Sequence, residues 1–261
     1  FSPSDTSSPV VITGLTNGTS YTIGLRAVNT VGAGDASATL TSIPFTIPNS
    51  PTSLTTTPAD TQVSVAFTPP SSNGGASITN YEHTTDGGTS WAVFSPSDTS
   101  SPVVITGLTN GTSYTIGLRA VNTVGAGDAS ANVTSIPFTI PNAPTSLTTT
   151  PVDTQVSVAF TSPSSNGGLS ITNYEYSTDG GTSWAAFSPA DTSSPVAITG
   201  LTNGTTYAIG LRAVSAAGSG TAAAIVTSIA ADTPNAPTGL SATAGDAQVS
   251  VAFTPPLSNG G

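Results

Sequence analysis

The chain has 261 residues, of which only 6% are charged, and its formal net charge is −10. It contains no cysteine and no lysine, which excludes disulfides, thiolate metal sites and Lys–Asn isopeptide bonds. Its three arginines are too few to neutralise a nucleic-acid backbone or to bind an anionic bilayer, and no apolar run is long enough to insert in a membrane.

The sequence repeats itself with a period of 93 residues. Residues 1–47 match residues 94–140 at 45 of 47 positions, and residues 48–93 match residues 141–186 at 39 of 46 positions. A period of this length is the size of a whole domain rather than of one turn of a solenoid. The chain is therefore expected to be a string of nearly identical domains.

The period divides the chain into two complete and two partial repeats. We expect this segment to be a window on a longer array. The alternative is that the partial repeats of neighbouring molecules complete each other, although together they lack the equivalent of residues 76–93. The predicted domains are a partial repeat at 1–47, complete repeats at 48–140 and 141–233, and a partial repeat at 234–261.

The apolar pattern of one repeat predicts seven short strands and no helix. Alternation is strictest at residues 61–68, where Val63, Val65 and Phe67 share one face. Turns rich in Gly, Pro, Asn and Asp separate the strands about every ten residues, a spacing typical of an antiparallel β-sandwich. In chain order, the strands of the first complete repeat are expected at residues 49–54, 61–68, 77–85, 91–94, 103–108, 112–121 and 130–136.

A leucine stands six residues before a tyrosine in every repeat that contains this segment: Leu15 and Tyr21, Leu108 and Tyr114, Leu201 and Tyr207. Together with residues 144–147, 156–160, 165–175 and 200–214, this spacing resembles fibronectin type III domains of the bacterial kind, along the whole chain. The resemblance implies tandem all-β, immunoglobulin-like sandwiches of seven strands. It also implies a tyrosine corner, in which the tyrosine hydroxyl bonds to the backbone.

The second strand commonly carries a core tryptophan in this family. Phe67, Phe160 and Phe253 occupy that place here. Trp91 and Trp184, on another strand, are candidates for supplying the missing aromatic bulk.

The residues do not assemble a catalytic site. The single histidine, His83, becomes Tyr176 in the next copy, so we expect a solvent-facing strand position rather than a catalytic or zinc-binding one. Carboxylate pairs such as Glu82 and Asp86 lie along a strand and its turn, without the cleft that glycoside hydrolysis needs. The chain is therefore predicted not to be an enzyme and to hold no cofactor.

Calcium is the one metal for which the sequence leaves an alternative. Asp60, Asp98 and Asp128, with their equivalents, are candidate ligands between domains. Calcium needs six to eight oxygen ligands, and no closely spaced run of acids supplies them. The acidic surface is more simply a means of staying soluble.

The function that we expect is a structural array: a stalk, spacer or fibre of a secreted or cell-surface bacterial protein, whose partners are its own neighbouring repeats. One alternative is an adhesin or carbohydrate-binding array acting through avidity toward glycans or surface proteins. Tyr81, Trp91 and Phe94 would then be the ligand face. Two further alternatives are an accessory region of a polysaccharide-degrading enzyme and a subunit that self-associates into an extracellular filament.

The linkers favour a stiff array. Residues 136–142 contain two prolines and no flexible Gly/Ser stretch, which predicts a fixed junction. Residues 229–234 lack one proline and the phenylalanine, so we expect that junction to bend more easily.

Overall fold

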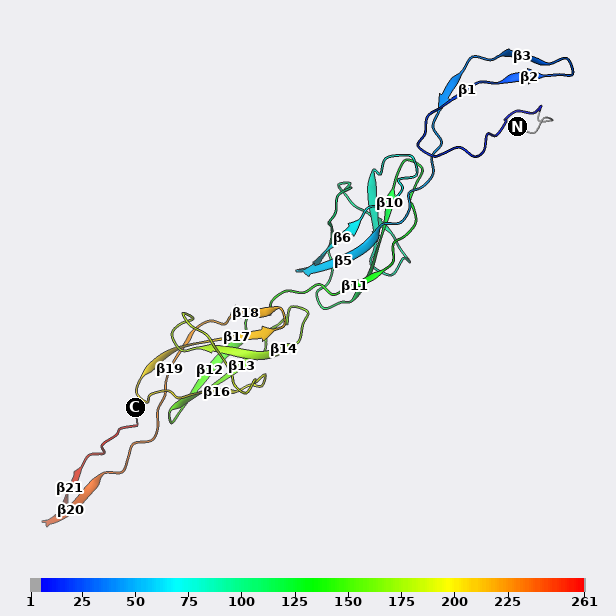
Figure 1. Ribbon diagram of the computed structural model, residues 1–261. Helices are drawn as coiled ribbons and strands as arrows, with labels where there is room; N and C mark the ends of the chain where they lie inside the picture. Colours follow the sequence, from blue (N-terminus) through cyan, green and yellow to red (C-terminus); the bar gives the residue numbers. More distant parts are fainter. Residues whose placement is uncertain (1–5, 261) are drawn as a thin grey trace. The chain divides into compact units, whose positions relative to one another are not determined.

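The computed structural model describes residues 6–260 (Figure 1). All of the regular secondary structure in this part of the chain is β-strand. These residues include no helix that could cross a bilayer. The chain divides into two compact units, residues 1–137 and 138–261, so the last three residues of the predicted repeat 48–140 belong to the second unit.

The first complete repeat is an antiparallel sandwich of seven strands. One sheet has the order β5-β6-β9 and the other β11-β10-β7-β8. The first strand begins and ends later than the sequence pattern predicts, because its pairing with β6 continues through Pro58 to Ala59. The strands are β5 (Thr52–Ala59), β6 (Gln62–Thr68), β7 (Asn80–Thr84), β8 (Ala92–Val93), β9 (Val103–Thr106), β10 (Tyr114–Val121) and β11 (Val133–Ser135).

The second complete repeat has the same two sheets. The order is β12-β13-β16 in one sheet and β15-β14-β17-β18 in the other, and β19 also pairs with β17. The last strand of the repeat is thus interrupted and contacts β17 as two segments. The strands are β12 (Thr145–Val152), β13 (Gln155–Thr161), β14 (Ile171–Ser177), β15 (Ala185–Ala186), β16 (Val196–Thr199), β17 (Thr206–Ser215), β18 (Gly218–Ala222) and β19 (Val226–Ile229).

Each complete repeat closes around a hydrophobic core of its own. Side chains alternate between the two faces of a strand, so the apolar positions of β6 all point between the sheets. Val63 and Val65 are fully buried, and Phe67 is nearly so. Leu118 and Ile116 of β10 face them from the other sheet. The alternating pattern therefore has the structural meaning expected from the sequence.

The aromatic bulk of the core comes from a tyrosine rather than from a tryptophan. The ring centroid of Phe67 lies 4.6 Å from that of Tyr81, and Phe160 and Tyr174 are also 4.6 Å apart. The expectation that Trp91 and Trp184 fill the core is wrong. Both lie against arginines that point away from it.

The described residues of the partial repeats form only some of the strands of a sandwich. Residues 238–254 form one hairpin, in which Val251 is 57% exposed although its counterparts Val65 and Val158 are fully buried. The sheet that covers these counterparts is not present in a two-stranded hairpin. The strands of the partial repeats are β1 (Tyr21–Ile23), β2 (Arg26–Val28), β3 (Ala33–Ala36), β4 (Leu40–Ser42), β20 (Thr238–Gly245) and β21 (Gln248–Thr254).

Candidate functional site

The three tyrosines of the predicted corners make the same contact in all three repeats that contain them. The hydroxyl of Tyr114 accepts a hydrogen bond of 2.9 Å from the backbone N–H of Thr109, five residues earlier. Tyr21 and Tyr207 make the equivalent bonds, also of 2.9 Å. The leucines of the corners differ in burial, because Leu108 belongs to the core of a complete repeat whereas Leu15 lies in a partial one. Leu201 packs against the core of the second complete repeat.

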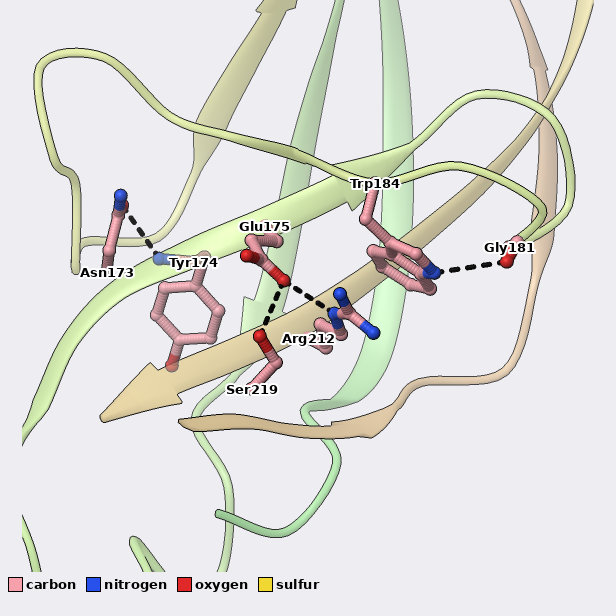
Figure 2. Close-up of polar contacts among 7 residues, drawn as sticks. All are labelled: Asn173, Tyr174, Glu175, Gly181, Trp184, Arg212 and Ser219. Carbon is pink, nitrogen blue, oxygen red and sulfur yellow. Dashed lines mark hydrogen bonds and ion pairs between the residues drawn. The ribbon is translucent and has the colours of Figure 1, made fainter. Parts of the chain in front are cut away.

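A tryptophan, an arginine and a glutamate lie together on the outer face of the larger sheet (Figure 2). Glu175 of β14 is paired with Arg212 of β17 in the strand register, and their side chains meet at 2.6 Å. The guanidinium carbon of Arg212 lies 4.4 Å from the centre of the Trp184 ring, within the range of a cation–π contact. Leu211 and Ala213, on either side of Arg212, are fully buried. Arg212 therefore points to the solvent side of the sheet.

The first complete repeat has the same arrangement. Arg119 lies 4.4 Å from the centre of the Trp91 ring and 2.5 Å from a carboxylate oxygen of Glu82. In the second repeat Ser219 adds a hydrogen bond of 2.9 Å to Glu175. These side chains hold one another in place, and the arginine takes up one face of each indole. We call this set of three side chains the Trp–Arg–Glu stack.

The residues predicted as a ligand face do not form one surface. Tyr81 is 1% exposed and belongs to the core. Phe94 packs against the same core. Trp91 alone lies with the Trp–Arg–Glu stack on the outer side of the sheet. As a set, Tyr81, Trp91 and Phe94 are therefore not available to one ligand.

His83 is not the solvent-facing residue that the sequence predicts. It is paired with the buried Leu118, and its ring centroid lies 4.7 Å from that of Phe94. Its Nδ1 atom is buried and has no hydrogen-bond partner among residues 6–260. Burial lowers the pKa of the imidazole. Tyr176 takes the same place in the second repeat and packs on Phe187 at 4.8 Å.

A tight turn lies just before the tryptophan of each stack. In the first repeat the Asp86 carboxylate accepts hydrogen bonds from the Ser90 hydroxyl at 2.5 Å, the Thr84 hydroxyl at 2.6 Å and the Ser90 N–H at 3.0 Å. These bonds, that from the Ser90 hydroxyl most of all, lower the pKa of Asp86. Ser183 does the same for Asp179, whose pKa falls to about 2. The two carboxylates are thus engaged by the hydroxyl groups of their own turns.

The carboxylates of two candidate calcium ligands accept hydrogen bonds from other side chains. Asp60 accepts a hydrogen bond of 2.7 Å from the Asn110 amide, and Asp98 accepts one of 2.7 Å from the Ser100 hydroxyl. The backbone N–H of Asp128 donates to the carbonyl of Pro48 at 3.2 Å. The described residues hold no group of three or more His, Cys, Asp or Glu side chains placed to bind a metal.

At every junction between repeats, a single linker residue lies between two backbone hydrogen bonds. One bond is made to the preceding repeat and the other to the following repeat. Before Phe138, the carbonyl of Pro137 accepts from Gly111 N–H at 2.9 Å, and after it Thr139 N–H donates to Gly167 at 2.8 Å. The other two junctions make the same two bonds, including the third, for which the sequence predicts easier bending. At the first junction the bonds join Gly18 to Pro44 and Thr46 to Gly74, with Phe45 between them. At the third they join Gly204 to Ala230 and Asp232 to Gly260, with Ala231 between them.

The loop whose carbonyl accepts the bond from Thr46 or Thr139 leaves no space for a side chain beside the linker. A Cβ atom on Gly74 would lie 2.1 Å from the carbonyl oxygen of Thr46, and one on Gly167 would lie 2.0 Å from that of Thr139. Sequence reasoning missed these contacts. The only available signal was the Asn-Gly-Gly run at residues 73–75 and 166–168, which indicates a turn but not what lies against it.

Comparisons with known proteins agree with this architecture. Residues 49–136 match the model of the fibronectin type III domain family. Over 180 residues, which are 63% of this chain and 16% of the other protein, the sequence is 33% identical to Endoglucanase B of Cellulomonas fimi. The chain thus spans a small part of that relative's length.

Among solved structures, the FN1–FN3 domains of chicken CNTN1 are 15% identical, with a TM-score of 0.39 over 79% of this chain and 76% of that one. The family match covers the first complete repeat, and the second has nearly the same sequence and the same two sheets. The two complete repeats are therefore fibronectin type III β-sandwiches in tandem.

Proposed function

We propose that this array is a non-catalytic spacer of a larger secreted or cell-surface bacterial protein, which holds the other parts of that protein at a set distance. The observation that carries the proposal is the way in which each linker is tied. A single residue separates the last bond to one repeat from the first bond to the next. A flexible tether would instead need several unbonded residues, usually rich in Gly and Ser.

The chemistry of the repeats supports a mechanical role. The acids whose pKa values are lowered are bound in turns, and the glutamates of the Trp–Arg–Glu stacks are paired with arginine. Similarity to an endoglucanase, an enzyme named for cutting glucan chains, supports a place in a protein that is exported to reach polysaccharide.

Distance measurements between repeats test this proposal. The chain has no cysteine, so spin labels can be attached to cysteines introduced as Thr55→Cys and Thr148→Cys without further changes. Both positions are exposed and occupy the same place in successive repeats. We expect double electron–electron resonance to give one narrow distribution of distances between the two spin labels.

A matched control has a flexible Gly/Ser segment inserted after Phe138. This insertion removes the direct link between Pro137 and Thr139, and it should broaden the distribution greatly. If the doubly labelled chain without the insertion already gave a distribution as broad as that of the insertion variant, the array would be a tether and the spacer proposal would be wrong.

Glucan binding is the second candidate, favoured by the solvent-side tryptophan of each stack and by the name of the relative. Sedimentation with insoluble cellulose tests it, using the native chain and a variant with both Trp91→Ala and Trp184→Ala. Retention that disappears in the variant would support binding. Because Arg119 and Arg212 occupy one face of the two indoles, we expect the native chain to stay in solution.

A further inference from the structure

Each complete repeat receives the linker that precedes it between two loops. One loop follows the second strand, and its Gly74 accepts a hydrogen bond of 2.8 Å from Thr46 N–H. The other follows β10, and its Asp128 N–H donates to the carbonyl of Pro48 at 3.2 Å. A Cβ atom on Gly127 of this second loop would lie 2.3 Å from the same carbonyl oxygen. The linker main chain thus occupies a groove lined by glycines, which we call the linker groove.

One buried side chain ties the linker groove of the first repeat together. Asn122 is 4% exposed, and its Nδ2 atom donates both to the carbonyl of Thr46 at 2.8 Å and to that of Asn73 at 2.9 Å. Its Oδ1 atom accepts from Val124 N–H at 2.9 Å. A single amide therefore connects the linker, the first loop and the second loop, and uses both of its donor hydrogens.

The second repeat has a serine at this position. The hydroxyl of Ser215 accepts a hydrogen bond of 3.2 Å from Ala217 N–H in its own loop. A serine has one donor hydrogen and a shorter side chain, so it cannot replace both bonds of an amide. The backbone bond is nonetheless the same, because Thr139 N–H donates to Gly167 at 2.8 Å.

We propose that Asn122 is the residue that fixes the preceding linker in the linker groove, and that the junction at Thr46 is consequently held more tightly than the junction at Thr139. This inference rests on the spacer function, since it assigns different stiffness to successive joints of the array. Asn122 is a positioning residue. It acts on the linker main chain rather than on a ligand from outside.

Hydrogen exchange at two backbone amides tests the proposal directly. Thr46 and Thr139 stand in the same Pro-Phe-Thr-Ile-Pro sequence, so their intrinsic exchange rates are equal. In the 261-residue chain we expect Thr46 N–H to exchange about tenfold more slowly, which is the effect of one or two buried neutral hydrogen bonds. Asn122→Ser should bring Thr46 to the rate of Thr139, and Ser215→Asn should slow Thr139.

The amide of Leu118, deep in the sheet, separates local from global effects. Asn122→Ser is expected to leave its exchange unchanged while that of Thr46 accelerates. Equal rates for Thr46 and Thr139 in the native chain would overturn the proposal. So would an acceleration of Leu118 as large as that of Thr46, since Asn122 would then stabilise the repeat as a whole. A broad distance distribution together with unequal exchange would instead contradict only the spacer function.

Discussion

Tyr114 and Tyr207 show how much a single hydroxyl can organise in so small a sandwich. Each stands at the start of the strand that carries much of the core, and each accepts a bond from a backbone N–H five residues earlier. That N–H follows the leucine of the corner, so the bond holds the turn on the leucine side against the strand. The contact is local in sequence, which is why spacing alone could predict it.

Tyr114→Phe should destabilise the first complete repeat by about 1 kcal/mol, because it removes one hydrogen bond and leaves the ring in place. Urea unfolding followed by Trp91 fluorescence, in a chain in which Trp184→Phe leaves one tryptophan, would measure this loss. Tyr207→Phe is the matched control, which should leave the Trp91 transition where it was.

His83 should make the stability of the first repeat depend on pH. Burial lowers its pKa in the folded state, whereas the unfolded chain keeps the ordinary value of about 6.5. The unfolded state therefore binds more protons as the pH falls below about 6.5, and stability falls with it until the folded-state pKa is reached. Above about pH 6.5, where the imidazole is neutral in both states, this stability is fully retained.

The same single-tryptophan chain can report this effect. Its urea midpoint should be lower at about pH 5 than at about pH 7.5, and His83→Tyr, which copies Tyr176 of the second repeat, should remove most of the difference. Comparable loss of stability in acid with His83→Tyr would mean that other groups cause it.

Among the elements, strands were predictable and their contacts with other parts of the chain were not. The alternation of Val63, Val65 and Phe67 specifies which face of β6 is buried, since the side-chain period of a strand is two. The partnership of Glu82 with Arg119 joins residues 37 apart and depends on which strands become neighbours. A pattern along one strand contains no such information, so the Trp–Arg–Glu stack could not be found from it.

The linker groove escaped prediction for a related reason. Its walls are loops whose residues suggest only turns, and its occupant is the backbone of another segment. The close approach of Gly74 to the carbonyl of Thr46 is a property of the folded repeat. The sequence boundary at Pro48 correspondingly differs from the structural one, because Thr46 is already bonded to the repeat that follows it.

Two glycines with nearly the same backbone conformation allow the cost of backbone strain to be measured apart from the cost of a steric clash with the linker. Gly74 has a φ of +74° and Gly107 a φ of +76°, but only at Gly74 would a Cβ atom meet the linker. Gly107→Ala should cost about 1–2 kcal/mol for the left-handed conformation. Gly74→Ala should cost this much and also expel the linker.

Limited digestion with chymotrypsin would show the difference, because Phe45 lies in the linker and is 59% exposed. Cleavage after Phe45 should be faster in Gly74→Ala than in the native chain and unchanged in Gly107→Ala. If both variants were cut at the native rate, the linker would not depend on the groove.

In the whole molecule, the two complete repeats have separate cores, and no residue belongs to both. This separation suits an array whose length can change by adding repeats, because each new one brings the apolar surface that stabilises it. Sandwiches of about this size bury enough surface to fold without disulfides or metal.

Separate cores predict separate unfolding. Leu118 is fully buried, so Leu118→Ala should destabilise the first repeat by about 2–5 kcal/mol through lost contacts and a cavity. This is a large part of the stability of a typical domain, about 5–15 kcal/mol. Trp91 fluorescence should show the transition at much lower urea, while Trp184, measured with Trp91→Phe, should unfold at its native midpoint. A joint shift of both transitions would mean that the repeats fold as one cooperative unit. Adding or removing one repeat would then change the stability of its neighbours as well as the length of the array.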